Sequence, residues 1–138
     1  MGWDIEPARQ RRSMRRAVTT DCQVVADTGF RLLGRWTLDV STEGIRVASL
    51  GHTARGEVVY VSLRLPRTSL WIDAIGEVVR VARGRRTGEP GPALGIRFTS
   101  IEPVDRALLA ASLRGLPPPL PARRVRVDYA AAVLAAAA

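Results

Sequence analysis

Short segments in which apolar and polar residues alternate fill most of the chain between residues 21 and 99. The clearest runs from Phe30 to Val40, and others lie at 45–47, 59–65, 70–81 and 94–99. A period of two places alternate side chains on opposite faces of a β-strand. The apolar phase of the first run contains Trp36, which we therefore expect in the core. Several such strands in succession favour an antiparallel sandwich or barrel.

Turn-forming residues separate the strand segments and support this fold class. They lie at 27–29, 41–44, 66–69 and 84–92. The longest run, 70–81, contains Gly76 near its middle, which predicts a bulge or kink because glycine weakens a strand interior. Gly44 ends one of the turns, where we expect the positive φ that is favourable for glycine.

One helix is expected after the last strand segment, over residues 103–114. Pro103 suits a first helical turn, and Gly115 is typical of the residue that follows a helix end. Four apolar side chains are expected to face the barrel: Val104, Leu108, Leu109 and Leu113.

The predicted domain organisation has three parts. Residues 1–20 form a basic N-terminal arm, and residues 21–115 form the barrel with its helix. Residues 116–138 form a proline-rich spacer and an alanine-rich tail. A chain of 138 residues is sufficient for one such domain.

The formal net charge of +8 indicates an anionic partner more than a cationic one. All 21 basic residues are arginine, so part of this excess reflects composition bias rather than selection for charge. Aromatic residues make up only 5% of the chain, and no row of aromatics interleaved with arginine is found. This pattern does not favour a protein that binds single-stranded nucleic acid.

Residues that commonly carry catalysis are scarce in this sequence. The one histidine, His52, lies in a Gly-His-Thr loop and is expected to be solvated, and the one cysteine, Cys22, begins an apolar run and is expected to be a buried thiol. No histidine–cysteine metal cluster can form, and the nucleotide and hydrolase signature motifs are absent from the sequence. We therefore expect no catalysis and no cofactor.

The sequence contains no apolar run of the roughly 18 residues that a membrane span needs. Its first residues are polar and basic, without the apolar region of a signal peptide. With a single cysteine, these features predict a cytoplasmic protein without a membrane span.

Two short motifs carry polar chemistry. Arginines at 11–16 give RxxxR in two registers, Arg11 with Arg15 and Arg12 with Arg16. The second motif, DVSTEG at 39–44, follows a strand segment. Taken alone, the first could be a solvated basic arm and the second an ordinary turn.

In this order and strand context, RxxxR followed by DxSxxG resembles the PilZ domain family. The resemblance covers about residues 9–115 and includes the segments LPRTSLW, IGEVVRV and LGIRF and the helix after them. It implies an all-β fold, a small six-stranded antiparallel barrel with a C-terminal helix. It also implies a receptor for the bacterial second messenger cyclic di-GMP.

The resemblance assigns ligand binding to five positions: Arg12, Arg16, Asp39, Ser41 and Gly44. Arg12 and Arg16 are preferred because Arg16 is followed directly by an apolar pair, as the family's second arginine usually is. Arg11 and Arg15 remain the alternative register. Trp71, as a stacking surface, and Arg97, which alternates outward from Ile96 and Phe98, are further candidates.

The chemistry of these residue types suits that ligand. Arginine offers a planar donor fork that matches phosphate or a guanine edge, and it can stack on a purine. Asp39 can accept from guanine N1–H and N2–H together, which adenine does not offer. The family implies a signal to a protein partner that controls motility, pili, adhesion or exopolysaccharide. The alternatives are a PilZ-like adaptor without nucleotide and a basic barrel for nucleic acid.

Overall fold

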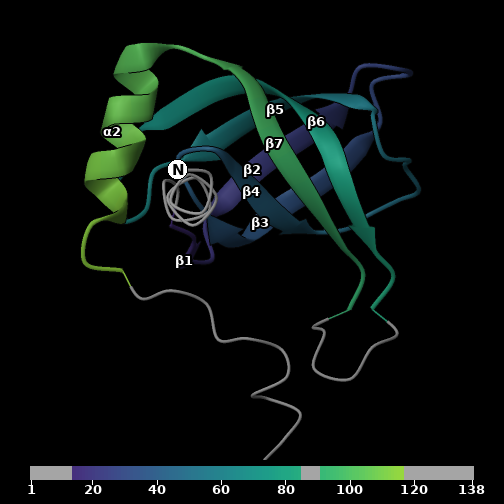
Figure 1. Ribbon diagram of the computed structural model, residues 1–138, viewed down its shortest axis with the longest axis horizontal. Helices are drawn as coiled ribbons and strands as arrows, with labels where there is room; N and C mark the ends of the chain where they lie inside the picture. Colours follow the sequence, from purple (N-terminus) through teal and green to yellow (C-terminus); the bar gives the residue numbers. More distant parts are fainter. Residues whose placement is uncertain (1–13, 85–90, 117–138) are drawn as a thin grey trace, which may run out of the picture.

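The computed structural model describes residues 14–84 and 91–116 of the chain (Figure 1). Its strands and single helix follow in chain order, as β1 (Arg16–Ala17), β2 (Asp21–Ala26), β3 (Leu32–Val40), β4 (Gly44–Ala48), β5 (Val58–Arg64), β6 (Trp71–Ala82), β7 (Ala93–Ile101) and α2 (Pro103–Leu113). All the strand pairings are antiparallel.

Six of the strands close into a barrel. The hydrogen-bonded order is β3-β2-β5-β6-β7-β4, and an additional pairing of β3 with β4 completes the ring. The two-residue strand β1 pairs with the end of β3, where Arg16 lies opposite Val40 and Ala17 opposite Asp39. The prediction of a six-stranded antiparallel barrel with a C-terminal helix is confirmed.

Alternating side chains of the strands fill the interior. Val24, Val47, Val59 and Leu94 are among the fully buried residues, and they come from four different strands. Cys22 belongs to the same core and is a free thiol, as the sequence predicts. Burial raises the pKa of its thiol to about 12, so the side chain stays neutral and unreactive at physiological pH.

The inward phase of β3 differs from the prediction. Trp36 is 42% exposed, whereas Thr37 is fully buried. The ladder between β3 and β4 shifts register between Thr37 and Asp39, so the strand changes phase before Val40 turns inward. Thr37 is accommodated inside because its hydroxyl donates to the Val18 carbonyl at 2.7 Å and accepts from the Thr20 amide at 3.0 Å. The expectation of Trp36 in the core is therefore wrong.

Gly76 marks an irregularity in β6, as the sequence predicts. The register between β6 and β7 shifts between Ile75 and Gly76. A Cβ atom at Gly76 would lie 2.8 Å from the Arg97 carbonyl oxygen, so glycine is required here by the close approach of β7.

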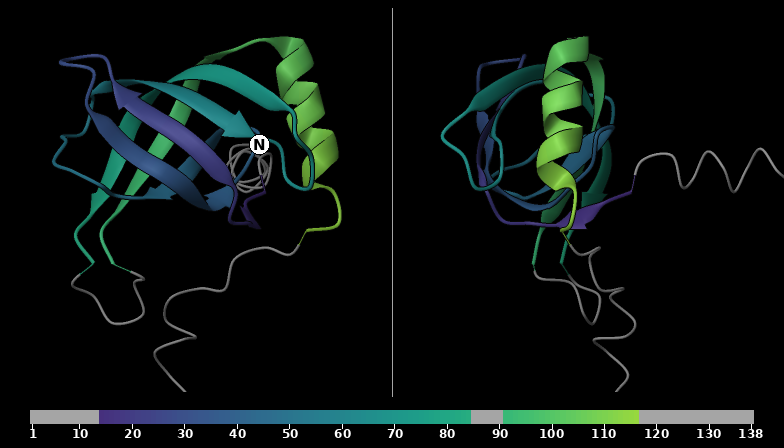
Figure 2. Two further views of the ribbon diagram at one scale, coloured as in Figure 1. Left: turned by 180° about the vertical axis from the view of Figure 1, so that it is seen from behind. Right: turned by 90° about the vertical axis from the view of Figure 1, so that its left-hand side faces the viewer.

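The helix α2 lies across one open end of the barrel (Figure 2). Leu109 and Leu113, one turn apart, are buried in the core. Val104 and Leu108 were also expected to face the barrel, but they are 61% and 42% exposed. They lie on a neighbouring stripe of the helix that the barrel end does not reach, because residues four apart share a face.

Part of the segment assigned to the arm lies against the barrel. Residues 16–17 form β1, Val18 packs on the core, and Thr20 is buried. Arg11 and Arg12, like most of the proposed spacer and tail, lie outside the described residues. Within residues 14–84 and 91–116, no helix is long and apolar enough to span a membrane.

Candidate functional site

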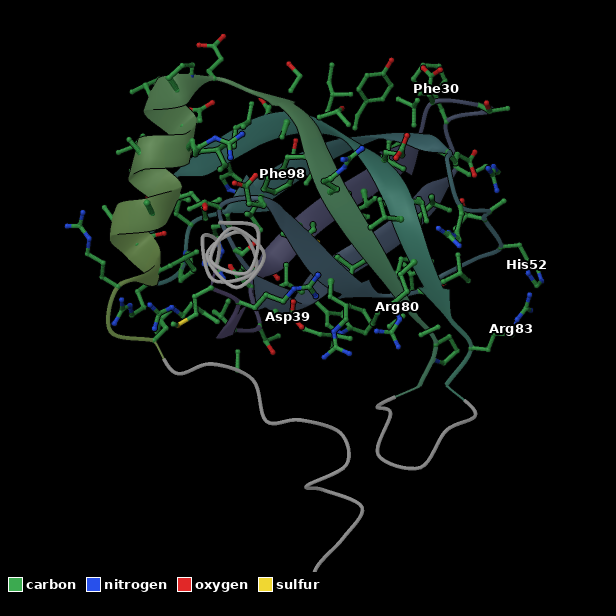
Figure 3. The ribbon with its side chains drawn as sticks, viewed as in Figure 1. Phe30, Asp39, His52, Arg80, Arg83 and Phe98 are labelled. Carbon is green, nitrogen blue, oxygen red and sulfur yellow. The ribbon has the colours of Figure 1, made fainter. Side chains whose placement is uncertain are left out.

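A row of four residues crosses the outer surface of strands β3, β4, β7 and β6. Asp39 lies opposite Arg46, Arg46 opposite Gly95, and Gly95 opposite Arg80. We call this set the arginine row. Figure 3 shows Asp39 and Arg80 along the same edge of the barrel, away from Phe30. Antiparallel register thus brings residues from distant parts of the chain into one line.

Asp39 is the one acidic residue of the arginine row. Its side chain is 3% exposed, and each of its carboxylate oxygens accepts from a different arginine. Arg46 Nε donates to Oδ2 at 2.7 Å, and Arg15 Nη1 donates to Oδ1 at 3.2 Å. The buried carboxylate is therefore neutralised by two cations, as a buried charge requires.

The two arginines hold Asp39 unequally. The Arg46 side chain is 30% exposed and extends from a strand, whereas the Arg15 side chain is 53% exposed and precedes the short strand β1. The bond from Arg15 is also the longer one. Arg46 is thus the fixed partner, and Arg15 is the partner that can leave with less structural change.

Ser41 and Gly44 form the tight turn between β3 and β4. The Ser41 hydroxyl accepts from the amides of Glu43 at 3.1 Å and Gly44 at 3.2 Å, and its own amide donates to the Gly44 carbonyl at 2.8 Å. Ser41 is buried. These bonds fix where β3 ends and thereby fix the position of Asp39.

Gly44 does not have the positive φ that the sequence led us to expect, since it is absent from the glycines with that conformation in the described chain. Its requirement is steric instead. A Cβ atom at Gly44 would lie 2.1 Å from the Ile96 carbonyl oxygen and 3.1 Å from Arg97 Cα. Gly44 therefore allows β7 to approach β4, which also aligns Gly95 with Arg46.

The arginines of the RxxxR motif lie in different places where they are described. Arg15 contacts Asp39, whereas Arg16 Nη1 donates to the carbonyl of Leu116 at 2.6 Å, after the end of α2. Arg11 and Arg12 lie outside the described residues. Of the preferred pair, the structure thus describes only Arg16, and it links the N-terminal segment to the helix end.

The two further candidates differ in their relation to the row. Arg97 lies opposite Gly44 and is exposed, with an ion pair to Glu77 at 3.4 Å. It is two residues from Gly95 on β7, so it borders the arginine row. Trp71 is 48% exposed but lies at the start of β6, opposite Arg64, nine residues from Arg80. The structure does not bring it to this group.

Sequence reasoning did not single out Arg46, Gly95 or Arg80. A signal was available for Arg46, because it alternates with the inward-facing Ile45 and Val47 and follows the turn after Asp39. Gly95 and Arg80 required the pairing of β6 with β7, which includes a register shift between Val78 and Arg80.

The arrangement suits a flat anionic ligand. Gly95 leaves no side chain between Arg46 and Arg80, and a Cβ atom there would already lie 3.2 Å from Arg80 Cβ. Arg80 is exposed and forms no ion pair within the described part of the chain. Guanidinium groups on either side of an open backbone can bind phosphate oxygens or the edge of a base.

No group of three or more metal-ligating side chains occurs in residues 14–84 and 91–116. His52 is exposed in its loop, as expected.

Comparisons with solved structures agree with this fold. The chain is similar to the inhibitor of motility from Bacillus subtilis (MotI/DgrA), with 21% identity and a TM-score of 0.61 over 84% of this chain. That match covers 52% of the motility inhibitor, so this chain spans about half its length.

Two isolated PilZ domains are also similar. The PilZ domain of YcgR from Escherichia coli, solved with c-di-GMP, has 16% identity and a TM-score of 0.60, covering 85% of this chain and 95% of that domain. The PilZ domain of CeSA from a cellulose-synthesizing bacterium has 16% identity and a TM-score of 0.53, covering 73% and 95% respectively. No curated protein matches the chain.

The family model of the PilZ domain matches residues 9–115. This range contains both sequence motifs, every strand of the barrel and the helix. The chain therefore belongs to the PilZ domain family.

Proposed function

We propose that this chain is a non-catalytic receptor that binds cyclic di-GMP on the arginine row. The observation that carries the proposal is the buried carboxylate of Asp39 between Arg15 and Arg46, in line with Gly95 and Arg80. Family membership supports it, as does the similarity to a PilZ domain solved with c-di-GMP. The excess of positive charge favours a dianionic ligand.

The proposed binding reaction is an exchange of partners at Asp39. A guanine edge offers two N–H donors to the carboxylate and displaces Arg15, while Arg46 stays in place. Arg15 then binds a phosphate of the same ligand, so its charge remains neutralised. Gly95 lets the ligand lie close to the backbone, and Arg80 contacts its far side.

The proposed signal leaves the site through Arg16. Arg15 and Arg16 are neighbours, and Arg16 contacts the Leu116 carbonyl beyond α2. Movement of Arg15 towards a phosphate changes the position of β1, and thus of this contact. Binding would thereby alter a surface at the end of α2 for a protein partner. Control of motility is one candidate output, because MotI is an inhibitor of motility.

Calorimetry with three ligands tests the binding proposal. We expect micromolar or tighter affinity for cyclic di-GMP, much weaker binding of cyclic di-AMP, and weak binding of a single-stranded oligonucleotide. Arg15→Ala and Arg80→Ala should each cost about 1.5 kcal/mol of binding free energy. Arg55→Ala, which removes an exposed arginine from another loop, is the matched control. Equal affinity for the two dinucleotides would contradict the role of Asp39.

The arginine register has its own test. The proposed exchange uses Arg15, which belongs to the alternative pair, so losses of affinity in Arg12→Ala and Arg16→Ala would show that the pair favoured by the sequence also contacts the ligand. Damage confined to Arg11→Ala and Arg15→Ala would assign the other register. Amide hydrogen exchange should show rising protection of residues 14–20 with ligand and no change in β5. Equal protection of residues 14–20 with and without ligand would place the signal elsewhere.

A further inference from the structure

A second row crosses the outer surface of the barrel, and its side chains are apolar. Leu32 of β3 lies opposite Val25 of β2, Val25 opposite Tyr60 of β5, and Tyr60 opposite Ile75 of β6. We call these four residues the apolar row. Leu32, Tyr60 and Ile75 are 44%, 42% and 39% exposed, so their neighbours do not cover them. Four apolar positions in direct register form one continuous surface.

A shallow groove borders this row. It has a volume of ≈ 310 Å³ and is lined by Tyr60, Ile75, Ser62, Asp73, Ser100 and Glu102, among others. At the other end of the row, Phe30 is 76% exposed and holds a φ of 48°, which is uncommon for an aromatic residue. Figure 3 shows Phe30 on the opposite edge of the barrel from Asp39.

The carboxylates beside the apolar row differ from those elsewhere in the described chain. Arginine pairs with each of five acidic residues, namely Asp21, Asp39, Glu43, Glu57 and Glu77. Asp27 and Asp73 instead accept from hydroxyl groups, of Tyr60 at 2.7 Å and Ser62 at 2.6 Å. Within the described ranges, neither of these nor Glu102 is paired with an arginine.

We propose that the apolar row and its groove bind a partner protein through a segment that combines basic and aliphatic side chains. The aliphatic groups cover Tyr60 and Ile75, and the basic groups pair with Asp73, Glu102 and Asp27. Three carboxylates that pair with no arginine of the described ranges surround an apolar surface, in a chain with a net charge of +8, and they favour a cationic occupant at this place.

A symmetric pair of copies fits the surface less well. A two-fold interface would place the row against itself, which brings Asp73 and Glu102 towards their own counterparts. A segment of opposite charge avoids that repulsion. The inference goes beyond the proposed ligand site, because the two rows share only strands β3 and β6 and have no residue in common. Its test needs no cyclic di-GMP.

Nuclear magnetic resonance of the isotope-labelled full chain tests this proposal. The probe is a synthetic peptide, acetyl-Arg-Leu-Arg-Val-Arg-Leu-amide, and its control replaces each arginine with glutamate. We expect the basic peptide to shift the amide signals of Tyr60, Ser62, Asp73, Ile75 and Ser100 in a saturable manner at 150 mM salt. The acidic peptide should shift none of them.

Variants separate local pairing from general electrostatics. The double variant Asp73→Asn with Glu102→Gln should weaken peptide binding by at least about fivefold. Asp105→Asn removes a helix carboxylate that also forms no ion pair in the described chain but does not line the groove, and it should change binding less than about twofold. Equal losses in both, or shifts spread over the whole barrel, would overturn the proposal. Concentration-dependent shifts of the same amides without peptide would overturn it in favour of a second copy.

Discussion

The arginine row and the apolar row are built on the same barrel by the same backbone pairing, yet they treat charge in opposite ways. In the arginine row, the one carboxylate is buried and held by two guanidinium groups. Beside the apolar row, Asp27 and Asp73 are exposed and accept from hydroxyl groups, and no arginine of the described chain pairs with them. Under the proposed binding reaction, a ligand of the first site must therefore replace an arginine.

In the apolar row, no ion pair of the described chain has to be broken before a partner can bind. Leu32, Tyr60 and Ile75 are exposed, and so are the three acidic residues beside the row. Surface charge on this chain is thus arranged locally, and the net charge of +8 does not predict the charge around either row. The two proposals accordingly assign a small anion and a basic segment to different sides of one domain.

A substitution in the turn that aligns the arginine row should reduce stability the most. In Gly44→Ala, a methyl group would lie 2.1 Å from the Ile96 carbonyl oxygen, so β4 and β7 must separate. We expect the free energy of unfolding to fall by about 3 kcal/mol. Urea denaturation measures it. Gly51→Ala is the control, since nothing lies within 4 Å of its Cβ position. Equal stabilities of the two variants would contradict the steric role of Gly44.

A matched pair of carboxylates gives the next largest effect. Asp39→Asn leaves the partly buried Arg46 without its counter-charge, and we expect about 2 kcal/mol of lost stability together with loss of cyclic di-GMP binding. Asp73→Asn should change stability by less than about 0.5 kcal/mol and leave nucleotide affinity unchanged. Denaturation and calorimetry on both proteins test the contrast. Similar losses in the two variants would show that the rows are not independent.

The smallest effect concerns the core that lies beneath both rows. The pKa of Cys22 is about 12 in the folded chain and near 9.0 when exposed, so only the unfolded state ionises between these values. Its contribution is therefore complete below pH 9 and is lost as pH rises towards 12, by about 1.4 kcal/mol at pH 10. Denaturation of the protein and of Cys22→Ala at pH 8 and pH 10 measures it. A pH dependence that is identical in both proteins would contradict this assignment.

The rate at which the Cys22 thiol is labelled also distinguishes the Gly44 and Asp73 variants. Reaction of Cys22 with a thiol reagent at pH 8 should stay slow in Asp73→Asn and rise in Gly44→Ala, because only the second opens the barrel. Fast labelling of Cys22 in the protein without substitutions, under native conditions, would argue against a buried thiol.

Alternation and turns were sufficient to predict strands β3 to β7, an antiparallel arrangement and the position of the helix, whereas β1 lies in the segment that was predicted to be an arm. The exposure of Trp36 was not predicted, because the register shift near Thr37 depends on β4, which the local sequence pattern does not include. The exposure of Val104 and Leu108 was not predicted, for a similar reason. A helix pattern gives an apolar face, but only the barrel end determines how much of that face is covered.

The sequence identified Asp39 and the turn after it, but not the partners of Asp39. Arg46 follows Asp39 in the same hairpin, whereas Gly95 becomes its neighbour through the pairing of β4 with β7, which lie far apart in the chain. The apolar row had no sequence signal at all. Leu32, Tyr60 and Ile75 read as ordinary members of alternating runs, and only the ring closure shows which of them point outward in one line.

The pairing of β3 with β4 has a consequence for how such a chain can change over evolutionary time. Because the ring is closed, a substitution that shifted one strand by a residue would have to move every other strand with it. Outward positions with side chains in solvent can instead vary singly, unlike Gly95, whose Cβ position lies 3.2 Å from Arg80 Cβ. New specificities on this scaffold would then arise by substitutions in one row while the other row is retained. Ligand and partner could therefore diversify at separate rates.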